Sequence, residues 1–438
     1  MYQLPLKKIC VAFIACLFIS GTSRVTAQSI NPSFVIGDAL PDAPALAPRG
    51  EYKVGVRTLN LLHKNQVDVL NAKAGIAPLY DRPLTVEVWY PAVLPAGKKE
   101  EVAYQDFLGQ RNDSTRPLIP FDVKGRALRD ATPLQQPAPF PLIIVSHGYL
   151  GSRYIMTYLT ENLASKGYVV VAIDHTESTY KDVGGFASTL LNRAKDDLFV
   201  LDEIARFSKP NGKSFLSGIA DADNTAIIGY SMGGYGALNA AGAGYSNKLD
   251  SFFRQITSGN TSIESRITGN AEFIASADKR IKAVVAFAPW GMQRGVWDAK
   301  GLAGLKVPTF LVAGSQDDVS GYEDGTKAIY TGLVNADHYL LTYENARHNV
   351  APNPPPPESL QAGVNFNEYY HYAEPAWNEH RINNINQHFV TAFLGIWLQH
   401  KDYGKYLSLP EKSNQGNWTG FKPRTSVGLE LNHAVSVQ

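Results

Sequence analysis

One short motif in the chain has the residue types that nucleophilic catalysis needs. Gly229-Tyr230-Ser231-Met232-Gly233 lies between an apolar run at residues 225–230, expected to be a strand, and a Gly- and Ala-rich stretch at residues 232–243, expected to be a helix. At such a corner a serine occupies a tight turn that exposes its hydroxyl, and the glycines let strand and helix approach closely. The helix N-terminus favours negative charge developing beside the hydroxyl. We therefore interpret Ser231 as a nucleophile rather than as part of a glycine-rich packing turn.

A serine hydroxyl reacts well only beside a base, and the base needs an acid to orient it. Residues 308–314 are expected to form a strand, and Asp317 and Asp318 follow it. His348 follows a last expected strand at residues 338–343. The chain order Ser, Asp, His is typical of hydrolases whose serine sits between a strand and a helix. We expect His348 to be the base and Asp317 its acid, with Asp318 as the alternative.

The reaction also needs N–H donors for the oxyanion that forms on the substrate. One is expected from Met232, which directly follows the serine. The other is expected from the loop Ser146-His147-Gly148-Tyr149, which follows an expected strand at residues 142–145. Because Gly148 permits a tight backbone, Tyr149 can offer its N–H, although an ordinary glycine turn would also explain Gly148. The predicted oxyanion hole is Tyr149 and Met232.

A sheet covered by helices must position these residues. Between residues 141 and 348, short apolar runs alternate with stretches of helical character. Runs without polar alternation suit parallel strands that are buried on both faces. The sequence thus predicts an α/β fold, with a mostly parallel sheet of about eight strands and helices on both faces. The expected elements are strands at 142–145, 168–173, 226–228, 283–287, 309–312 and 339–341, antiparallel edge strands at 52–59 and 84–90, and helices at 154–166, 189–207, 232–243 and 382–400.

Two polar stretches are longer than ordinary connections. They lie near residues 103–139 and 244–279, and we expect both to be insertions in a single domain at residues 28–438. Insertions at strand ends commonly form lids or binding walls, although either stretch could equally be a surface excursion without a role.

The first 27 residues have the order of a secretory signal peptide. Two lysines precede a short apolar stretch at residues 9–19, and small residues end the segment at Ala27. The apolar stretch is shorter than the roughly 20 residues that a membrane span needs. We expect a secreted or periplasmic protein without a stable membrane anchor. A lipid-anchored Cys16 is the weaker alternative, because the apolar core before it would be very short.

The overall charge excludes some classes of partner. Lys plus Arg number 41 and Asp plus Glu number 40, which leaves a net charge of +1. Nucleic acids and anionic membranes are bound through concentrated basic charge, so neither is expected as the main partner. Both cysteines fall within the predicted signal peptide, and the chain has neither an H-E-x-x-H motif nor a phosphate-binding glycine loop. No metal, organic cofactor, disulfide or thiol nucleophile is therefore expected.

Several pieces of the chain together resemble the α/β-hydrolase superfamily. More narrowly, they resemble the branch of platelet-activating factor acetylhydrolases, dienelactone-hydrolase-like proteins and bacterial polyester hydrolases of the cutinase type. The resemblance implies an α/β-hydrolase fold, and it implies that Tyr149 and Trp290 flank the bound acyl group. A core aromatic is the other interpretation of Trp290. The pieces are RPLTVEVWYP at 82–91, SHGY at 146–149, AIDH at 172–175, GYSMGG at 229–234 and APW at 288–290.

The chain also departs from the polyester hydrolases that it resembles. Tyr230 stands before the serine, where those enzymes usually have His or Trp, and the expected mature chain cannot form the disulfide that many of them carry. The two insertions could close the shallow cleft that a polymer needs. These departures favour a small or medium ester over a polymeric one.

The residues together predict a secreted serine hydrolase of carboxylic esters. Ser231, Asp317 and His348 would carry the reaction through an acyl-enzyme. A polyester hydrolase of the cutinase type and an amidase or peptidase on the same fold are the alternatives. A binding protein on an inactive hydrolase scaffold is a third, and it is disfavoured because no catalytic residue type is missing.

Overall fold

The computed structural model describes residues 34–436, so the predicted signal peptide at residues 1–27 lies outside the described residues. From Val35 onward the chain forms one compact unit by its internal contacts. Within the described part of the chain, no helix is both long and apolar enough to cross a membrane.

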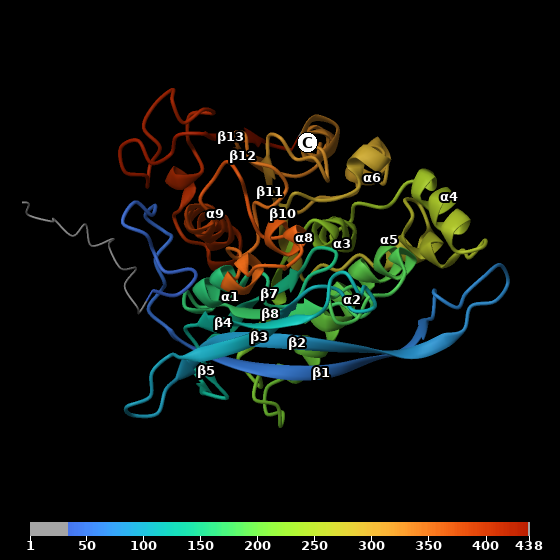
Figure 1. Ribbon diagram of the computed structural model, residues 1–438, viewed down its shortest axis with the longest axis horizontal. Coiled ribbons are helices and arrows are strands. Elements are labelled where there is room, and N and C mark those ends of the chain that lie inside the picture. Colours follow the sequence, from blue (N-terminus) through green and yellow to red (C-terminus); the bar gives the residue numbers. More distant parts are fainter. Residues whose placement is uncertain (1–33, 437–438) are drawn as a thin grey trace, which may run out of the picture. The chain divides into compact units, whose positions relative to one another are not determined.

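Six parallel strands form the centre of the main sheet (Figure 1), in the order β12-β11-β10-β9-β7-β8. The long strands β2 and β1 continue the sheet beyond β8, and both pairings are antiparallel. At the opposite edge β13 pairs antiparallel with β12. Two-residue strands, β5 and β6, pair with β1 and β2. The bounds are β1 Lys53–Val67, β2 Leu79–Val93, β5 Leu128–Arg129, β6 Thr132–Pro133, β7 Phe140–Ser146, β8 Val169–Asp174, β9 Ala220–Tyr230, β10 Ile281–Phe287, β11 Thr309–Gly314, β12 His338–Tyr343 and β13 Leu429–Ala434.

Helices cover both faces of this sheet, as the apolar runs predict. Leu142 and Ile144 of β7 pack into one core with α2 and α3, whereas Ile143 and Val145 pack into the other core with α1 and α9. Successive side chains of a strand point to opposite faces, so a strand between two cores must be apolar at every position. The bounds of these helices are α1 Thr157–Ala164, α2 Phe186–Phe207, α3 Met232–Ala240 and α9 Glu379–Gln399.

The two expected insertions form small structures of their own. The first contains the hairpin of β3 and β4, a separate two-stranded sheet. The second contains α4, α5 and a 3₁₀ turn. Further short helices follow later strands. The bounds are β3 Val102–Leu108, β4 Ile119–Gly125, α4 Asn247–Ile256, α5 Ala271–Ala275, α6 Ala299–Leu302, α7 Lys327–Gly332 and α8 Phe366–Tyr370.

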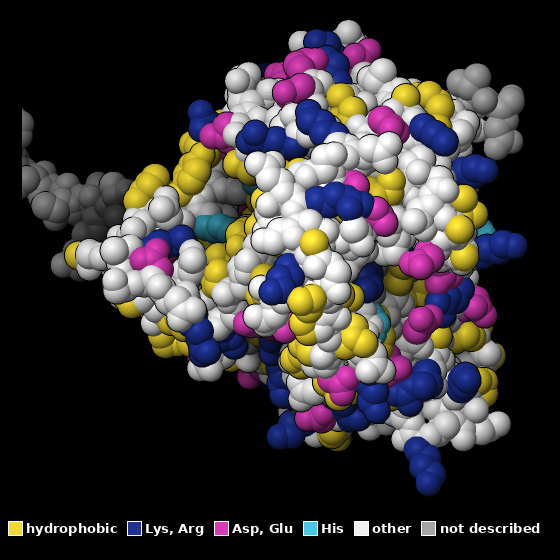
Figure 2. All heavy atoms as spheres, turned by 90° about the vertical axis from the view of Figure 1, so that its right-hand side faces the viewer, with side chains coloured by type: hydrophobic (Ala, Val, Ile, Leu, Met, Phe, Trp, Pro, Cys, Tyr) yellow, Lys and Arg dark blue, Asp and Glu magenta, His cyan; other side chains and the backbone are white. Residues whose placement is uncertain are grey.

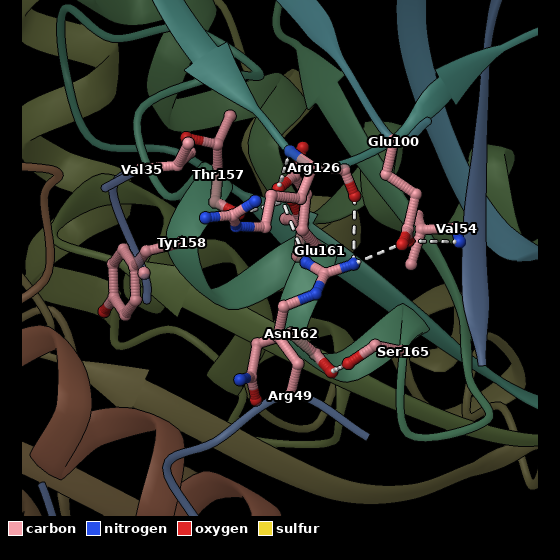
Figure 3. Close-up of polar contacts among 12 residues, drawn as sticks. Val35, Arg49, Val54, Glu100, Arg126, Thr157, Tyr158, Glu161, Asn162 and Ser165 are labelled. Atoms are coloured by element: carbon pink, nitrogen blue, oxygen red, sulfur yellow. Dashed lines mark hydrogen bonds and ion pairs between the residues drawn. The ribbon is translucent and has the colours of Figure 1, made fainter. Parts of the chain in front are cut away.

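A charged cluster around the buried Glu161 ties the segment before β1 to α1 and to the end of the β3–β4 hairpin (Figure 3). Arg49 lies 3.1 Å from a carboxylate oxygen of Glu100 and 3.6 Å from one of Glu161. Glu161 accepts a hydrogen bond from the backbone N–H of Arg126 (2.7 Å), and Glu100 accepts one from Val54 (2.9 Å). Buried carboxylates are tolerated when they are paired in this way.

The predicted elements are confirmed in type and order, with longer bounds in most strands. The expected edge strands at 52–59 and 84–90 are two 15-residue strands. The eight expected strands are present. The short strands β3 to β6 were not predicted, and neither was β13. Of its six residues only Leu429 and Leu431 are buried, so a strand at the sheet edge lacks the unbroken apolar run that marks the central strands.

Candidate active site

Ser231 occupies the corner between β9 and α3 in a strained backbone conformation. Its φ is 52° and its ψ is −113°, a region that non-glycine residues rarely adopt and that is found mostly at functional sites. The corner is tight because Gly233 packs against the backbone of Ser146, where a methyl group would collide with the Ser146 carbonyl. The Ser231 N–H donates to the Phe287 carbonyl (2.9 Å). The sequence therefore folds locally so that the strand turns sharply beneath the hydroxyl.

The loops after β12 and β11 bring His348 and Asp317 to this corner. The Oγ of Ser231 lies 3.0 Å from Nε2 of His348, and Nδ1 of His348 lies 3.0 Å from each carboxylate oxygen of Asp317. The carboxylate is held in place because its Oδ1 accepts N–H bonds from Val319 (2.9 Å) and Ser320 (2.8 Å). All of these loops leave the carboxyl ends of parallel strands, which is where open α/β sheets form their sites.

The structure separates the two candidate acids. The side chain of Asp317 is 0% exposed and contacts His348. The side chain of Asp318 is 43% exposed, and it pairs instead with Arg347 (2.6 Å). The aspartate that orients His348 in this structure is therefore Asp317, while Asp318 lies at the rim of the same cavity.

The loop after β7 passes directly over the serine. A methyl group built on Gly148 would lie 3.4 Å from Cβ of Ser231 and only 3.2 Å from the Tyr230 ring, so the glycine relieves a tight contact with that ring. Met232 is the first residue of α3, and a first helical N–H has no partner within its own helix. The two predicted oxyanion donors, Tyr149 and Met232, thus belong to the two segments that border the hydroxyl.

Sequence reasoning missed the side chain that supports this loop. Arg193 of α2 is buried, and its Nη2 donates to the Gly148 carbonyl (3.2 Å) and to Ser178 Oγ (2.7 Å). Burial lowers the pKa of Arg193 to about 9, against the opposing effect of Asp197 and Asp196. The signal in the sequence is an arginine that falls among the apolar positions of the α2 helix. Because charged residues are rarely fully buried without a partner, an arginine at such a position indicates a polar contact inside the protein.

A second Ser-His-Asp series lies behind the same loop. Ser146 Oγ lies 2.8 Å from Nε2 of His175, and Nδ1 of His175 lies 2.9 Å from Asp196, which Arg82 also contacts at 2.9 Å. Burial lowers the pKa of His175 to about 3, which keeps the ring neutral. Ser146 is 0% exposed, so no substrate can reach it. This series supports the sheet end and has no access to solvent.

A cavity of about 190 Å³ opens in front of Ser231. Tyr149, Tyr230 and Asn349 contribute to its walls, and the Tyr230 hydroxyl donates to Asn349 Oδ1 (3.0 Å). His371 also lines it; burial lowers the pKa of this ring to about 4. The ring bonded to Ser231 is nevertheless that of His348. A larger cavity of about 520 Å³ involves the segment before β1 and the amino end of β7, and none of the predicted site residues line it.

Trp290 lies beside Ser231 but faces a different cavity. Its backbone N–H donates to the Ser231 carbonyl (3.1 Å). Its ring lines a neighbouring cavity of about 390 Å³. The ring of Phe186, whose role the sequence did not predict, stands 5.5 Å from Tyr149 and 5.4 Å from Trp290 between ring centroids. The two aromatic residues expected to flank an acyl group are therefore joined through a third ring.

Comparisons with known proteins agree with this architecture. Residues 132–250 match the family described as PET hydrolase-like, a stretch that includes Tyr149 and Ser231 but neither Asp317 nor His348. The chain is 24% identical over 212 residues to cutinase est1 of Thermobifida alba, covering 48% of this chain and 54% of that protein. It is 23% identical over 210 residues to bis(hydroxyethyl) terephthalate hydrolase of Streptomyces coelicolor, covering 48% and 50%. The chain thus spans about half the length of the curated relatives it matches.

A solved structure extends the likeness of the fold to most of the chain. A ferulic acid esterase from Streptomyces cinnamoneus superposes with a TM-score of 0.54 at 20% identity, covering 89% of this chain and 99% of that one. At this identity the likeness concerns the fold alone. Taken with the sheet order and the serine corner, the structural likeness shows an α/β-hydrolase fold, and about half of the chain is similar in sequence to cutinase-type polyester hydrolases.

Proposed function

We propose that the chain is a serine carboxylic-ester hydrolase that forms an acyl-enzyme on Ser231. The observation that carries the proposal is the series from Ser231 Oγ through His348 to Asp317, with each step at 3.0 Å and a cavity at the hydroxyl. This arrangement matches the division of roles in serine hydrolases: nucleophile, general base and orienting carboxylate.

In this mechanism Ser231 Oγ attacks the ester carbonyl carbon while His348 Nε2 takes its proton. The N–H groups of Tyr149 and Met232 bind the oxyanion of the tetrahedral intermediate. The intermediate collapses, the bond to the alcohol oxygen breaks, and His348 returns the proton to the leaving alcohol. A water molecule then attacks the acyl-enzyme by the same steps and releases the acid. Asp317 holds the ring in the required tautomer and stabilises its cation.

The walls of the cavity support a small or medium ester as substrate. Asn349 Nδ2 attaches the end of α8 and the segment after it, because it donates to the carbonyls of Tyr370 (2.5 Å) and Ala373 (2.9 Å). The first insertion supports α8 from outside, since Glu368 accepts bonds from Gly109 N–H (2.7 Å) and Arg116 Nε (2.6 Å). The insertion therefore acts through α8 as a wall that narrows access to Ser231.

A polyester substrate is the second candidate, and the relatives favour it. The matching family is described as PET hydrolase-like, and the curated relatives include cutinases. We further infer export as a secreted or periplasmic enzyme, which rests on the signal-like order of residues 1–27. The proposal includes neither a stable membrane anchor nor a nucleic-acid partner.

The test is hydrolysis of 4-nitrophenyl esters from acetate to long acyl chains by the chain without residues 1–27, with Ser231→Ala as control. We expect turnover that depends on Ser231 and falls with acyl length. Turnover maintained on long chains, together with release of acids from a polyester film, would favour the polyester candidate. Full activity of Ser231→Ala would refute the proposal. Faster turnover of a matched 4-nitroanilide than of the ester would replace it with the amidase alternative.

A further inference from the structure

The cavity next to the nucleophile combines an apolar interior with two cationic side chains. It has a volume of about 390 Å³. Its apolar lining comes from the half-buried rings of Phe186 and Trp290 and from Leu249 and Val296, with the exposed Phe252 at its edge. Such a concave, mostly apolar site with few polar groups is typical of small-molecule binding.

Lys248 of α4 and Arg294 of the loop after β10 bring positive charge to this cavity. Both line it, and within the described chain neither forms an ion pair or a side-chain hydrogen bond. The Lys248 side chain lies against Gly295, since a methyl group built there would come within 3.1 Å of its Nζ. The two cations thus belong to separate elements, and the Lys248 side chain lies against the residue that follows Arg294. Unpaired cations beside an apolar cavity complement an anionic group attached to an apolar one.

The frame that carries the two cations is ordered by backbone and side-chain bonds. The N–H of Ser246 donates to the Val296 carbonyl (2.8 Å), and its Oγ donates to the Gly295 carbonyl (2.5 Å). Ser246 also caps α4, which contains Lys248. Because the helix start and the loop are joined in this way, the fold sets the separation of the two backbone positions that carry the cations. Figure 2 shows this side of the molecule, on which Lys and Arg side chains stand among hydrophobic ones with acidic groups interspersed.

The cavity borders the reaction centre at Phe186 and Trp290. Phe186 packs against Tyr149, which lines the cavity of Ser231. Trp290 forms the wall of the second cavity and donates its N–H to the Ser231 carbonyl. A substrate whose ester is at Ser231 would reach the cations by extending past these two rings.

We propose that this second cavity binds a carboxylate on the substrate, so that the enzyme prefers esters that carry a free carboxylate beyond an apolar segment. The inference rests on the proposed ester hydrolysis at Ser231. The apolar segment lies between the Phe186 and Trp290 rings and Leu249, and the carboxylate pairs with Lys248 and Arg294. The second insertion, which supplies Lys248 and Leu249, thereby acts as a specificity element.

Two pairs of esters test this preference, each differing only in charge. One pair is monomethyl suberate and its terminal amide, and the other is the acetate ester of 4-(hydroxymethyl)benzoate and that of 4-(hydroxymethyl)benzamide. Lys248 and Arg294 are exposed. Exposed ion pairs contribute up to about 1 kcal/mol each, so kcat/KM should favour the acid by about tenfold in at least one pair of esters. The preference should shrink as ionic strength rises.

The variant Lys248→Gln/Arg294→Gln should remove the preference and leave the rate on the neutral amides unchanged. Lys98→Gln/Lys99→Gln is the matched control, because it removes two exposed charges from the loop after β2 and should retain the preference. Equal rates for acid and amide in both pairs would overturn the proposal. So would a preference that persists in the Lys248/Arg294 variant.

A binding measurement separates this proposal from the proposed function. Calorimetric titration of Ser231→Ala with 4-(hydroxymethyl)benzoate needs no turnover. We expect binding that weakens about tenfold in the Lys248→Gln/Arg294→Gln background, with the neutral amide bound equally by both. Charge-dependent binding without ester hydrolysis would leave the subsite standing and remove the proposed function. Ester hydrolysis without charge-dependent binding would support the proposed function and overturn the carboxylate subsite.

Discussion

Replacing Asp317 by asparagine tests the one residue of the proposed triad that acts only through His348. Oδ1 of Asp317 is fixed by the N–H groups of Val319 and Ser320, and only an acceptor can replace it there. In Asp317→Asn the amide oxygen must therefore occupy that place, and the NH₂ group must point toward Nδ1 of His348. An N–H donor facing Nδ1 favours the tautomer in which that nitrogen is the acceptor and the ring proton is on Nε2.

The consequence falls on the bond between His348 and the serine. Nε2 lies 3.0 Å from the Oγ of Ser231, and a protonated Nε2 can donate to the hydroxyl but cannot accept its proton. In Ser-His-Asp proteases the same change lowers kcat by about 10⁴-fold while the geometry stays intact. We expect a loss of about 10³- to 10⁴-fold in kcat here, with KM changed little.

The assay is steady-state hydrolysis of 4-nitrophenyl acetate by the wild-type, Asp317→Asn and Asp318→Asn enzymes. Asp318 is the matched control because it is the adjacent residue of the same type, and its carboxylate pairs with the exposed Arg347. Asp318→Asn should keep kcat within about threefold, since an exposed ion pair contributes at most about 1 kcal/mol. If Asp317→Asn kept a tenth of the activity, or if both variants lost equal activity, our assignment of the acid would be wrong.

Three further predictions concern stability and specificity. Burial raises the pKa of Asp106 to about 6 from 3.8, so its contribution to stability is present at low pH and is lost as pH rises through 6. Asp106→Asn should reduce the loss of unfolding free energy between pH 4.5 and 7.5 by up to about 2 kcal/mol in urea unfolding. Gly233→Ala should cost about 3 kcal/mol or more in the same assay, because the added methyl group collides with the Ser146 carbonyl. Phe186→Ala should raise the ratio of octanoate to acetate ester turnover by about tenfold, because the wall between the two cavities is removed.

Each of these three predictions has a matched comparison. Asp130→Asn removes an exposed carboxylate and should leave the pH profile of stability as it is; an unchanged profile in Asp106→Asn would contradict the first prediction. Gly404→Ala adds a methyl group into open space, and equal stability of the two alanine variants would contradict the second. Phe186→Leu keeps most of the apolar volume and should restore acetate preference; the third fails if the alanine variant keeps the wild-type ratio.

The sequence was most informative where local patterns repeat. The apolar runs predict the six central strands because burial on both faces demands apolar residues at every position. The strand-to-helix corner at Ser231 was predictable for a similar reason, since its small neighbours are needed by the turn itself. The hairpin of β3 and β4 was expected only as a polar insertion. Its alternating pattern buries one face alone, including Tyr104 and Phe121, and such short alternating runs also occur in loops.

The sequence by itself determined the fold class, the element order and a short set of candidate residues, because backbone sterics and hydrophobic periodicity act over a few residues. Only the tertiary structure decided which aspartate contacts His348, and that Ser231 rather than Ser146 is accessible. It also decided that Phe186, Lys248 and Trp290 line one cavity. These residues are far apart in the chain, and their distances follow from strand order and from how the insertions pack onto the sheet, which no local pattern encodes.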